Sequence, residues 1–254
     1  MDLIALAAVV LFAHGQTTER TVVAAERLGR AIGVPVTALP YWGQLTVEIE
    51  GTTVSKIVPV KPLGVDMGKV LAVTTVVDQV CDGKLEADAA RSALALAGRL
   101  PPVSTLRFTL LAAVGAASLG VIFGVADAVS LLLIAGSAAI GALVRRRPGF
   151  SANPFIKPLC AATIAGAVAG AGRLKLSEAI TLIAFCPCMV LVPGPHLLNG
   201  AIDLARTRVA LGIARLAYAC VFVLMICAGL WFGLVVTGAN PSGRRSGGAD
   251  AAGR

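Results

Sequence analysis

The stretch IARLAYACVFVLMICAGLWFGLVVT occupies residues 213–237 and contains a single charged residue, Arg215. A membrane-spanning helix needs about 20 consecutive, mostly apolar residues, because it must cross a hydrocarbon core about 30 Å thick. Such a helix satisfies every backbone polar group internally, which lipid demands. The stretch therefore predicts a transmembrane helix, and we expect the protein to be embedded in a lipid bilayer.

Further apolar stretches precede this helix and extend the prediction to a bundle. The chain is 57% hydrophobic and 14% charged, whereas ordinary soluble domains are about 25% charged. We expect an α-helical multi-pass membrane protein with about five transmembrane helices over residues 107–238, preceded by a small soluble α/β domain. The expected spans before the last one are Phe108–Ala126, Ala128–Val144, Phe155–Ala171 and a short, proline-interrupted Ala179–Val192.

Small residues recur at helical spacing within the expected spans. Such residues let two helix backbones approach each other closely in lipid. We therefore expect these positions to lie where helices contact each other. The pairs are Gly115 with Ser118, Gly120 with Gly124, and Gly166 with Gly170.

The residues before the bundle have an ordinary mixture of polar and apolar side chains. Leu45, Val47 and Ile49 alternate with polar residues, which is typical of a half-buried strand. The apolar run Leu3–Ala13 is too short to span a bilayer and lacks the basic start of a signal peptide, so we expect a buried or amphipathic helix. Residues 1–106 are therefore expected to form the α/β domain, and the Gly/Ser/Arg-rich residues 239–254 a disordered tail.

The formal net charge is +8, and many of the basic residues flank the expected spans. Cytoplasmic loops of membrane proteins carry an excess of Lys and Arg. Counted on the two sides of the bundle, the basic residues predict a cytoplasmic N-terminal domain and an extracytoplasmic C terminus. The expected location is the plasma (inner) membrane. No nucleic-acid partner is expected, because the sequence has no stripe of basic and aromatic residues.

Sequence motifs for catalysis or cofactor binding are not found. The chain contains no Walker loop, GxSxG or HExxH pattern, so we expect neither an enzyme nor a bound nucleotide. Cys186 and Cys188 are separated by one residue, a poor match to redox or zinc spacing. The six cysteines do not form the framework of a disulfide-rich secreted domain. We expect no cofactor and no metal.

The fourth expected span contains the feature that most favours transport. Residues 185–199 read FCPCMVLVPGPHLLN, in which Pro187, Pro193, Gly194 and Pro195 interrupt the apolar run. Proline removes a backbone hydrogen bond from a helix, and secondary transporters place broken helices of this kind at their substrate sites. The alternative is that Pro193, Gly194 and Pro195 are simply the loop that ends the fourth span.

Polar residues beside this break are candidates for a substrate or proton path. Asn199 and Asp203 are four residues apart and share a helix face. A carboxylate at membrane depth is costly and usually functional, and His196 could carry protons near neutral pH. Arg215 could pair with Asp203 or extend to the membrane surface, and the alternative for the group is a solvated interfacial loop. The candidate residues are Pro193, Gly194, His196, Asn199, Asp203 and Arg215.

A set of short motifs recurs along most of the chain in a fixed order. They are Gly15 with Arg20, Gly33, Gly64-Val65-Asp66, Asn153-Pro154-Phe155, Pro187 with Pro193-Gly194, Asn199 with Asp203, and Gly212 with Arg215. In this order and spacing, residues 15–238 resemble the threonine/serine exporter family, specifically its N-terminal half. One departure is Val22, where many relatives have a glutamate, so any role of that glutamate is absent here.

The resemblance implies export of threonine and serine driven by the proton-motive force. Split-gene members of the family are linked to small dicarboxylates. Full-length members carry a second hydrophobic half, and two such halves would be inverted relative to each other, as is common in transporters. The resemblance therefore implies that this chain is one subunit and that a second hydrophobic exporter half is encoded separately. A homo-oligomer is the alternative.

We therefore expect a subunit of a secondary, proton-coupled exporter of small hydroxy amino acids such as threonine and serine. Its expected partners are a small polar solute, the second exporter half and the lipid bilayer. The alternatives are an exporter of small dicarboxylates such as succinate, a non-transporting membrane assembly subunit, and a membrane-bound enzyme that uses the soluble domain.

Overall fold

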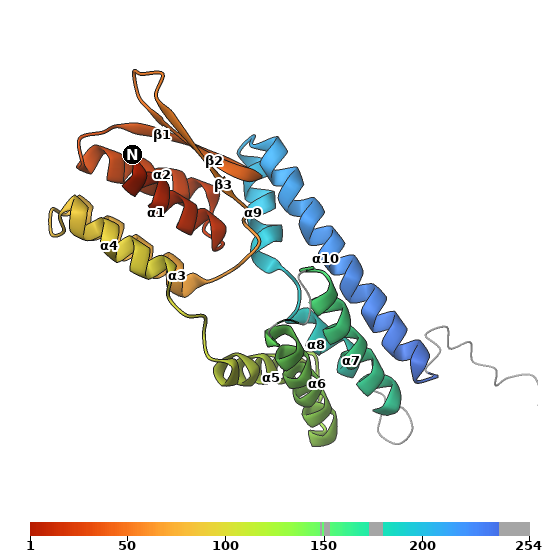
Figure 1. The fold of residues 1–254 in the computed structure, drawn as a ribbon. Coiled ribbons are helices and arrows are strands. Elements are labelled where there is room, and N and C mark those ends of the chain that lie inside the picture. Colours follow the sequence, from red (N-terminus) through yellow and green to blue (C-terminus); the bar gives the residue numbers. More distant parts are fainter. Residues whose placement is uncertain (148, 150–152, 173–179, 239–254) are drawn as a thin grey trace, which may run out of the picture. The chain divides into compact units, whose positions relative to one another are not determined.

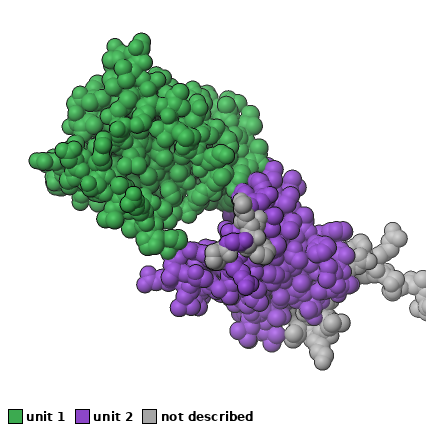
Figure 2. Space-filling model, viewed as in Figure 1, with its two compact units in different colours: residues 1–102, 193–219 green, residues 103–192, 220–254 purple. Residues whose placement is uncertain are grey.

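The computed structural model describes residues 1–147, 149, 153–172 and 180–238, so the expected tail lies outside the described residues. The chain divides into two compact units, which Figure 2 shows in different colours. Unit 1 comprises Met1–Pro102 and Pro193–Ala219, and unit 2 comprises Val103–Val192 and Cys220–Arg254. The last helix, α10 (Val209–Val236), therefore contributes its first part to unit 1 and the remainder to unit 2.

Unit 1 is built around its first helix, which is apolar on every side. The helices of this unit are α1 (Asp2–Ala13), α2 (Thr18–Ala31), α3 (Met67–Cys81), α4 (Ala87–Gly98), α9 (Gly194–Ala205) and the start of α10. Helix α1 contacts α2, α3, α4 and two strands, and its Ile4 and Phe12 are completely buried. A helix that is hydrophobic all round belongs in a core. The apolar run near the start of the chain is thus confirmed as a buried helix.

Three antiparallel strands complete unit 1 in the order β1-β2-β3 (Figure 1). They are β1 (Val36–Tyr41), β2 (Gly43–Ile49) and β3 (Ser55–Val60). Leu45 and Val47 of the central strand are completely buried and Glu48 is exposed, so the expected strand is confirmed. Leu45 pairs with Pro40 of β1 and with Val58 of β3. Strands β1 and β3 are the edges of the sheet.

Unit 2 is entirely helical over its described residues. Its helices are α5 (Thr105–Ile122), α6 (Ala128–Arg146), α7 (Ile156–Gly172), α8 (Ile180–Met189) and the remainder of α10. Helix α6 packs against α5, α7 and α8. Only 11% of the apolar window of α5 is buried. An apolar surface of this extent is expected to face lipid, since soluble monomers rarely expose one.

By length and composition, the described residues contain three or four candidate membrane spans, fewer than the five or so expected from the sequence. Among the described residues, α5, α6 and α10 are long and apolar enough to cross a bilayer, and α8 with α9 could form a fourth, broken span. Helix α7 has 17 residues and is too short by this criterion. The start of the expected fourth stretch lies outside the described residues. The chain is an α-helical membrane protein, and the count of about five spans stays a prediction.

Glycines bring helices of unit 2 into backbone contact. A Cβ atom added to Gly233 of α10 would lie 2.2 Å from the carbonyl oxygen of Thr163 in α7, and one added to Gly166 would lie 2.4 Å from that of Leu230. The expected contact role of Gly166 is thus confirmed, as is that of Gly120, which faces Ile134 of α6. The expected contact role is wrong for Gly115 and Gly124, because each has open space where a Cβ atom would be.

Candidate functional site

The candidate site lies in unit 1, on α9 and the first turns of α10. Helix α9 begins at Gly194, with Pro193 as its N-cap and Pro195 in its first turn. Proline suits this position because a first-turn residue has no helical partner for a backbone N–H. Pro193 and Gly194 therefore start a new helix after the end of α8 at Met189. Together α8 and α9 have the length and composition of one interrupted span.

Two glycines allow α9 and α10 to pack closely. A Cβ atom at Gly212 would lie 2.8 Å from Leu204 Cγ and 2.9 Å from the carbonyl oxygen of Gly200. One at Gly200 would lie 2.9 Å from Leu216 Cγ and 3.3 Å from the Cβ of Arg215. Neither position has room for a methyl group, so the two helices approach at the van der Waals limit. This approach brings short polar side chains of α9 within reach of α10.

Asp203 of α9 and Arg215 of α10 form a buried ion pair. Arg215 Nη1 lies 3.1 Å from Asp203 Oδ2, and each residue is only 1% exposed. The same carboxylate oxygen accepts a hydrogen bond of 3.0 Å from the hydroxyl of Thr18. The pairing of these two charges was one of two sequence-based alternatives for Arg215, and the structure has it. A solvated loop does not fit residues this deeply buried.

The guanidinium of Arg215 is incompletely satisfied. Its Nη1 is close to the carboxylate but misaligned for a hydrogen bond, and neither Nη1 nor Nε donates one to any described residue. The group lies 5.2 Å from the ring centroid of Phe12, a cation–π contact. Arginine carries five N–H donors, and burying unpaired donors costs free energy. The site therefore retains donors that could bind an anionic group.

Further charges lie around the pair. Arg208 Nη1 is 3.8 Å from Asp203 Oδ1, too far for a hydrogen bond but close enough for attraction. The side chain of Arg208 is one-third exposed. Arg206 forms an ion pair with Glu19 of α2. One buried carboxylate thus faces two guanidinium groups, and the immediate surroundings of Asp203 carry an excess of positive charge.

The remaining predicted residues lie on the same face of α9. Asn199 is 7% exposed, and its Nδ2 donates a hydrogen bond of 3.2 Å to the carbonyl oxygen of Gly15. His196 is 6% exposed and its ring stands 4.9 Å from that of Tyr218. His196, Asn199 and Asp203 are all buried in unit 1, and Arg215 joins them from α10. Pro193 and Gly194 shape the start of α9 and make no side-chain hydrogen bond of their own.

Some residues of the site escaped sequence reasoning. Thr18 bonds to Asp203 across 185 positions of sequence, and no local pattern marks such a contact. Phe12 stands over Arg215 from α1. Arg208 had a usable signal, because it follows Asp203 by five positions and lies just before α10. Its backbone N–H donates to the carbonyl oxygen of Asp203 at 2.8 Å, which closes the turn between the two helices.

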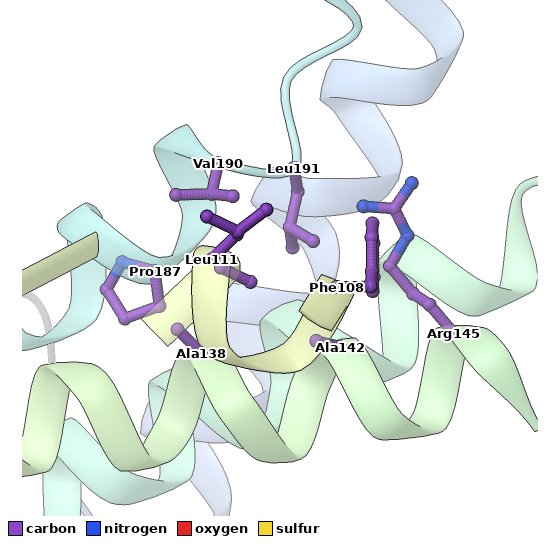
Figure 3. A pocket seen from close by; sticks show the side chains of 9 residues that line it. Phe108, Leu111, Ala138, Ala142, Arg145, Pro187, Val190 and Leu191 are labelled. Carbon is purple, nitrogen blue, oxygen red and sulfur yellow. The ribbon is translucent and has the colours of Figure 1, made fainter. Parts of the chain in front are cut away.

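Unit 2 contains a separate, apolar pocket of about 220 Å³ (Figure 3). Its walls come from α5, α6, α8 and the residues after α8, and they include Leu111, Ala138 and Pro187. The guanidinium of Arg145 lies 5.9 Å from the ring centroid of Phe108 at the edge of the pocket. With one charged side chain and otherwise apolar walls, this pocket suits a hydrocarbon group better than a polar solute.

The described residues contain no group of three or more His, Cys, Asp or Glu side chains that could hold a metal ion. All six cysteines are free thiols, and Cys186 and Cys188 are buried in α8. The chemistry of the polar cluster therefore comes from its carboxylate, guanidinium, amide, hydroxyl and imidazole groups. These are groups that bind and release small charged solutes and protons.

Comparison with known families identifies the family of this chain. The model of the family described as "Putative threonine/serine exporter" matches residues 2–237. The chain belongs to this family. Among curated proteins and among solved structures, none matches the chain. Membership of an exporter family makes the protein a membrane transport protein that handles a small polar solute. The family resemblance inferred from the sequence motifs is confirmed, and the assignment to the N-terminal half of the family stays a prediction.

Proposed function

We propose that this member of the exporter family is a subunit of a secondary exporter that moves threonine and serine out of the cell, coupled to protons. The observation that carries the proposal is the buried pair of Asp203 and Arg215. Ionisable groups inside membrane-spanning segments are costly and mark ion and solute pathways. A proton-coupled transporter needs a group that changes charge at the solute site, and Asp203 is that group.

Alternating occupation of Asp203 by solute and proton links the two movements. While Asp203 is ionised it attracts Arg215 and accepts the hydrogen bond from Thr18. The solute binds to this state, with its ammonium group at Asp203 and its carboxylate at the Nη1 and Nε donors of Arg215 that bond to no described residue. A proton that reaches Asp203 from outside the cell removes the negative charge and the attraction for the ammonium group, so the solute is released outside. Loss of this proton to the cytoplasm restores the carboxylate, so a proton enters the cell as a solute leaves it.

The proposal includes an orientation and a domain arrangement. Residues 1–106 form a cytoplasmic domain, residues 107–238 a bundle of about five spans, and residues 239–254 an extracytoplasmic tail in the plasma membrane. The basic residues near the spans support this orientation. Thr18, which donates to Asp203, belongs to the proposed cytoplasmic domain, so the proposed site is built partly from that domain, on the side where an exporter collects its solute. A separately encoded hydrophobic half, or a second copy of this chain, completes the transporter.

Small dicarboxylates such as succinate are the second candidate substrates. The specific observation in their favour is that two guanidinium groups, of Arg208 and Arg215, face the single carboxylate of Asp203. The two carboxylates of a dianion would neutralise both guanidinium groups. Guanidinium groups bind carboxylates in a matched, two-pronged geometry.

Transport in everted membrane vesicles tests the proposal. Vesicles from cells that produce this chain together with its hydrophobic partner are given an imposed pH gradient, and the accumulation of labelled L-threonine and of succinate is followed. We expect gradient-dependent accumulation of threonine that an uncoupler abolishes. We expect vesicles with this chain alone to contain the inserted protein but to accumulate no solute. Accumulation that ignores the pH gradient would contradict proton coupling, and full activity of the chain alone would contradict a separate second half.

A further inference from the structure

A groove of about 550 Å³ lies on the surface of unit 1, and the proposed mechanism does not use it. Its walls are α2, the edge strand β1 and the turn from α9 into α10. The lining residues are Val22, Glu26, Thr37, Ala38, Leu39, Pro40, Tyr41, Thr207, Arg208, Val209, Ala210 and Leu211. The volume falls within the range of about 300–1,000 Å³ that is usual for small-molecule sites. It is ample for an amino acid.

The groove is lined by one acidic and one basic side chain. Glu26 is its one acidic side chain and Arg208 its one basic side chain, and Thr37, Tyr41 and Thr207 add hydroxyl groups. Glu26 forms no ion pair with any residue that the structure describes, so its carboxylate is available. A zwitterion carries one ammonium and one carboxylate and complements this set. A dicarboxylate would place its second negative charge in the same groove as Glu26.

Strand β1 adds backbone groups to the groove. It pairs only with β2 in the described sheet, and five of its residues line the groove. Along an edge strand, alternate residues direct their N–H and C=O groups away from the sheet, where they are free to bind another molecule. The backbone-like part of an amino acid, with its ammonium and carboxylate, is suited to such an edge.

Arg208 connects the groove to the buried pair. Its side chain lines the groove and is one-third exposed, while its Nη1 is buried, donates no hydrogen bond to a described residue and lies 3.8 Å from Asp203 Oδ1. A carboxylate arriving in the groove therefore meets a guanidinium that is near Asp203 but not hydrogen-bonded to it. Solute in the groove competes with Asp203 for Arg208.

We infer that the groove between α2, β1 and the α9–α10 turn binds a small zwitterionic amino acid, with Arg208 receiving its carboxylate and Glu26 its ammonium group. The inference rests on the proposed export function and specifies its substrate class and point of entry. The solute binds first in the groove, and its carboxylate then moves from Arg208 to Arg215. Threonine and serine fit this chemistry, and succinate does not.

Binding to the purified full chain in lipid nanodiscs tests the inference by calorimetry. The probes are L-threonine, L-serine, threoninol, which lacks the carboxylate, and succinate. We expect threonine and serine to bind at concentrations of about 1 mM or below and threoninol and succinate to bind far more weakly. Arg208→Gln and Glu26→Gln should each weaken threonine binding about tenfold or more, because each removes a charge-assisted hydrogen bond. The matched surface changes Arg99→Gln and Glu50→Gln should leave binding unchanged.

Glu26→Gln is the decisive variant, because no contact joins Glu26 to Asp203, whereas Arg208 could act through Asp203 alone. Threonine binding that survives Glu26→Gln, preferential binding of succinate, or no binding to the wild-type chain would each overturn the inference. The export assay separates it from the proposed function. Threonine binding to the groove without export in vesicles would contradict the proposed function but support the groove as a binding site. Export that both groove variants leave intact would contradict the groove as a binding site but support the proposed function.

Discussion

The two units of this chain use close helix packing for opposite purposes. In unit 1, Gly200 and Gly212 let α9 and α10 approach so closely that a carboxylate and a guanidinium meet out of contact with solvent. In unit 2, Gly166 and Gly233 bring α7 and α10 together backbone to backbone, with no charged side chain at the contact. The first arrangement buries polar groups that lack some of their hydrogen-bond partners among the described residues. The second is a tight apolar contact of the kind that holds helices together in lipid.

Substitutions at these two kinds of contact should therefore have different effects. Where packing alone is at stake, an added methyl group should destabilise the fold without a specific effect on transport. Where charges are buried, removal of one partner should leave the other uncompensated, and removal of both should be tolerated much better.

Arg215→Met should have the largest effect. It leaves Asp203 buried with only the more distant Arg208 as counter-charge, and we expect a loss of about 4 kcal/mol in the free energy of unfolding. The double change Asp203→Leu with Arg215→Met removes both charges and should recover most of this loss. Unfolding in detergent with increasing denaturant measures both variants. Equal destabilisation of the single and double variants would show that the two side chains do not depend on each other.

Gly233→Ala should be next in size. The new Cβ would stand 2.2 Å from the carbonyl oxygen of Thr163, which belongs to the backbone of α7 and cannot rotate away. Over-packing of this kind costs about 3 kcal/mol. The control is Gly136→Ala in α6, where a Cβ has open space and alanine should stabilise the helix by about 0.5–1 kcal/mol. If both alanines have the same effect, unit 2 is not held by close glycine contacts.

Thr18→Val tests the smallest of the three effects. The change keeps the shape of the side chain but removes the hydroxyl that donates to Asp203, and we expect a loss of about 2 kcal/mol. Thr75→Val is the matched control, because that hydroxyl is exposed on α3 and, among the described residues, bonds only to the carbonyl oxygen of Leu71. The control should change stability by about 0.5 kcal/mol or less. An equally small effect at Thr18 would mean that its hydrogen bond to Asp203 does not stabilise the fold.

Local patterns made parts of this structure predictable. The long apolar run of α10, the alternation in β2 and the apolar α1 each follow from a period or a length that a short window reveals. The four polar candidates on α9 and α10 were also visible, because charge in an apolar segment is conspicuous. The contact between Thr18 and Asp203 was not, since 185 residues separate them. Nor was the contact role of Gly233, because a contact glycine differs from a lipid-facing one only through its partner helix.

The most direct test of the account is proton-driven threonine export by Asp203→Asn, measured in everted vesicles across pH 6–8 and expressed per amount of folded protein. Asparagine keeps the shape of the side chain and an oxygen that accepts from Thr18, but it cannot ionise. We expect this variant to lose gradient-driven export, while Asp88→Asn, an exposed change on α4, keeps it. Export by Asp203→Asn with the rate and pH dependence of the wild-type protein would contradict the central role given to this carboxylate.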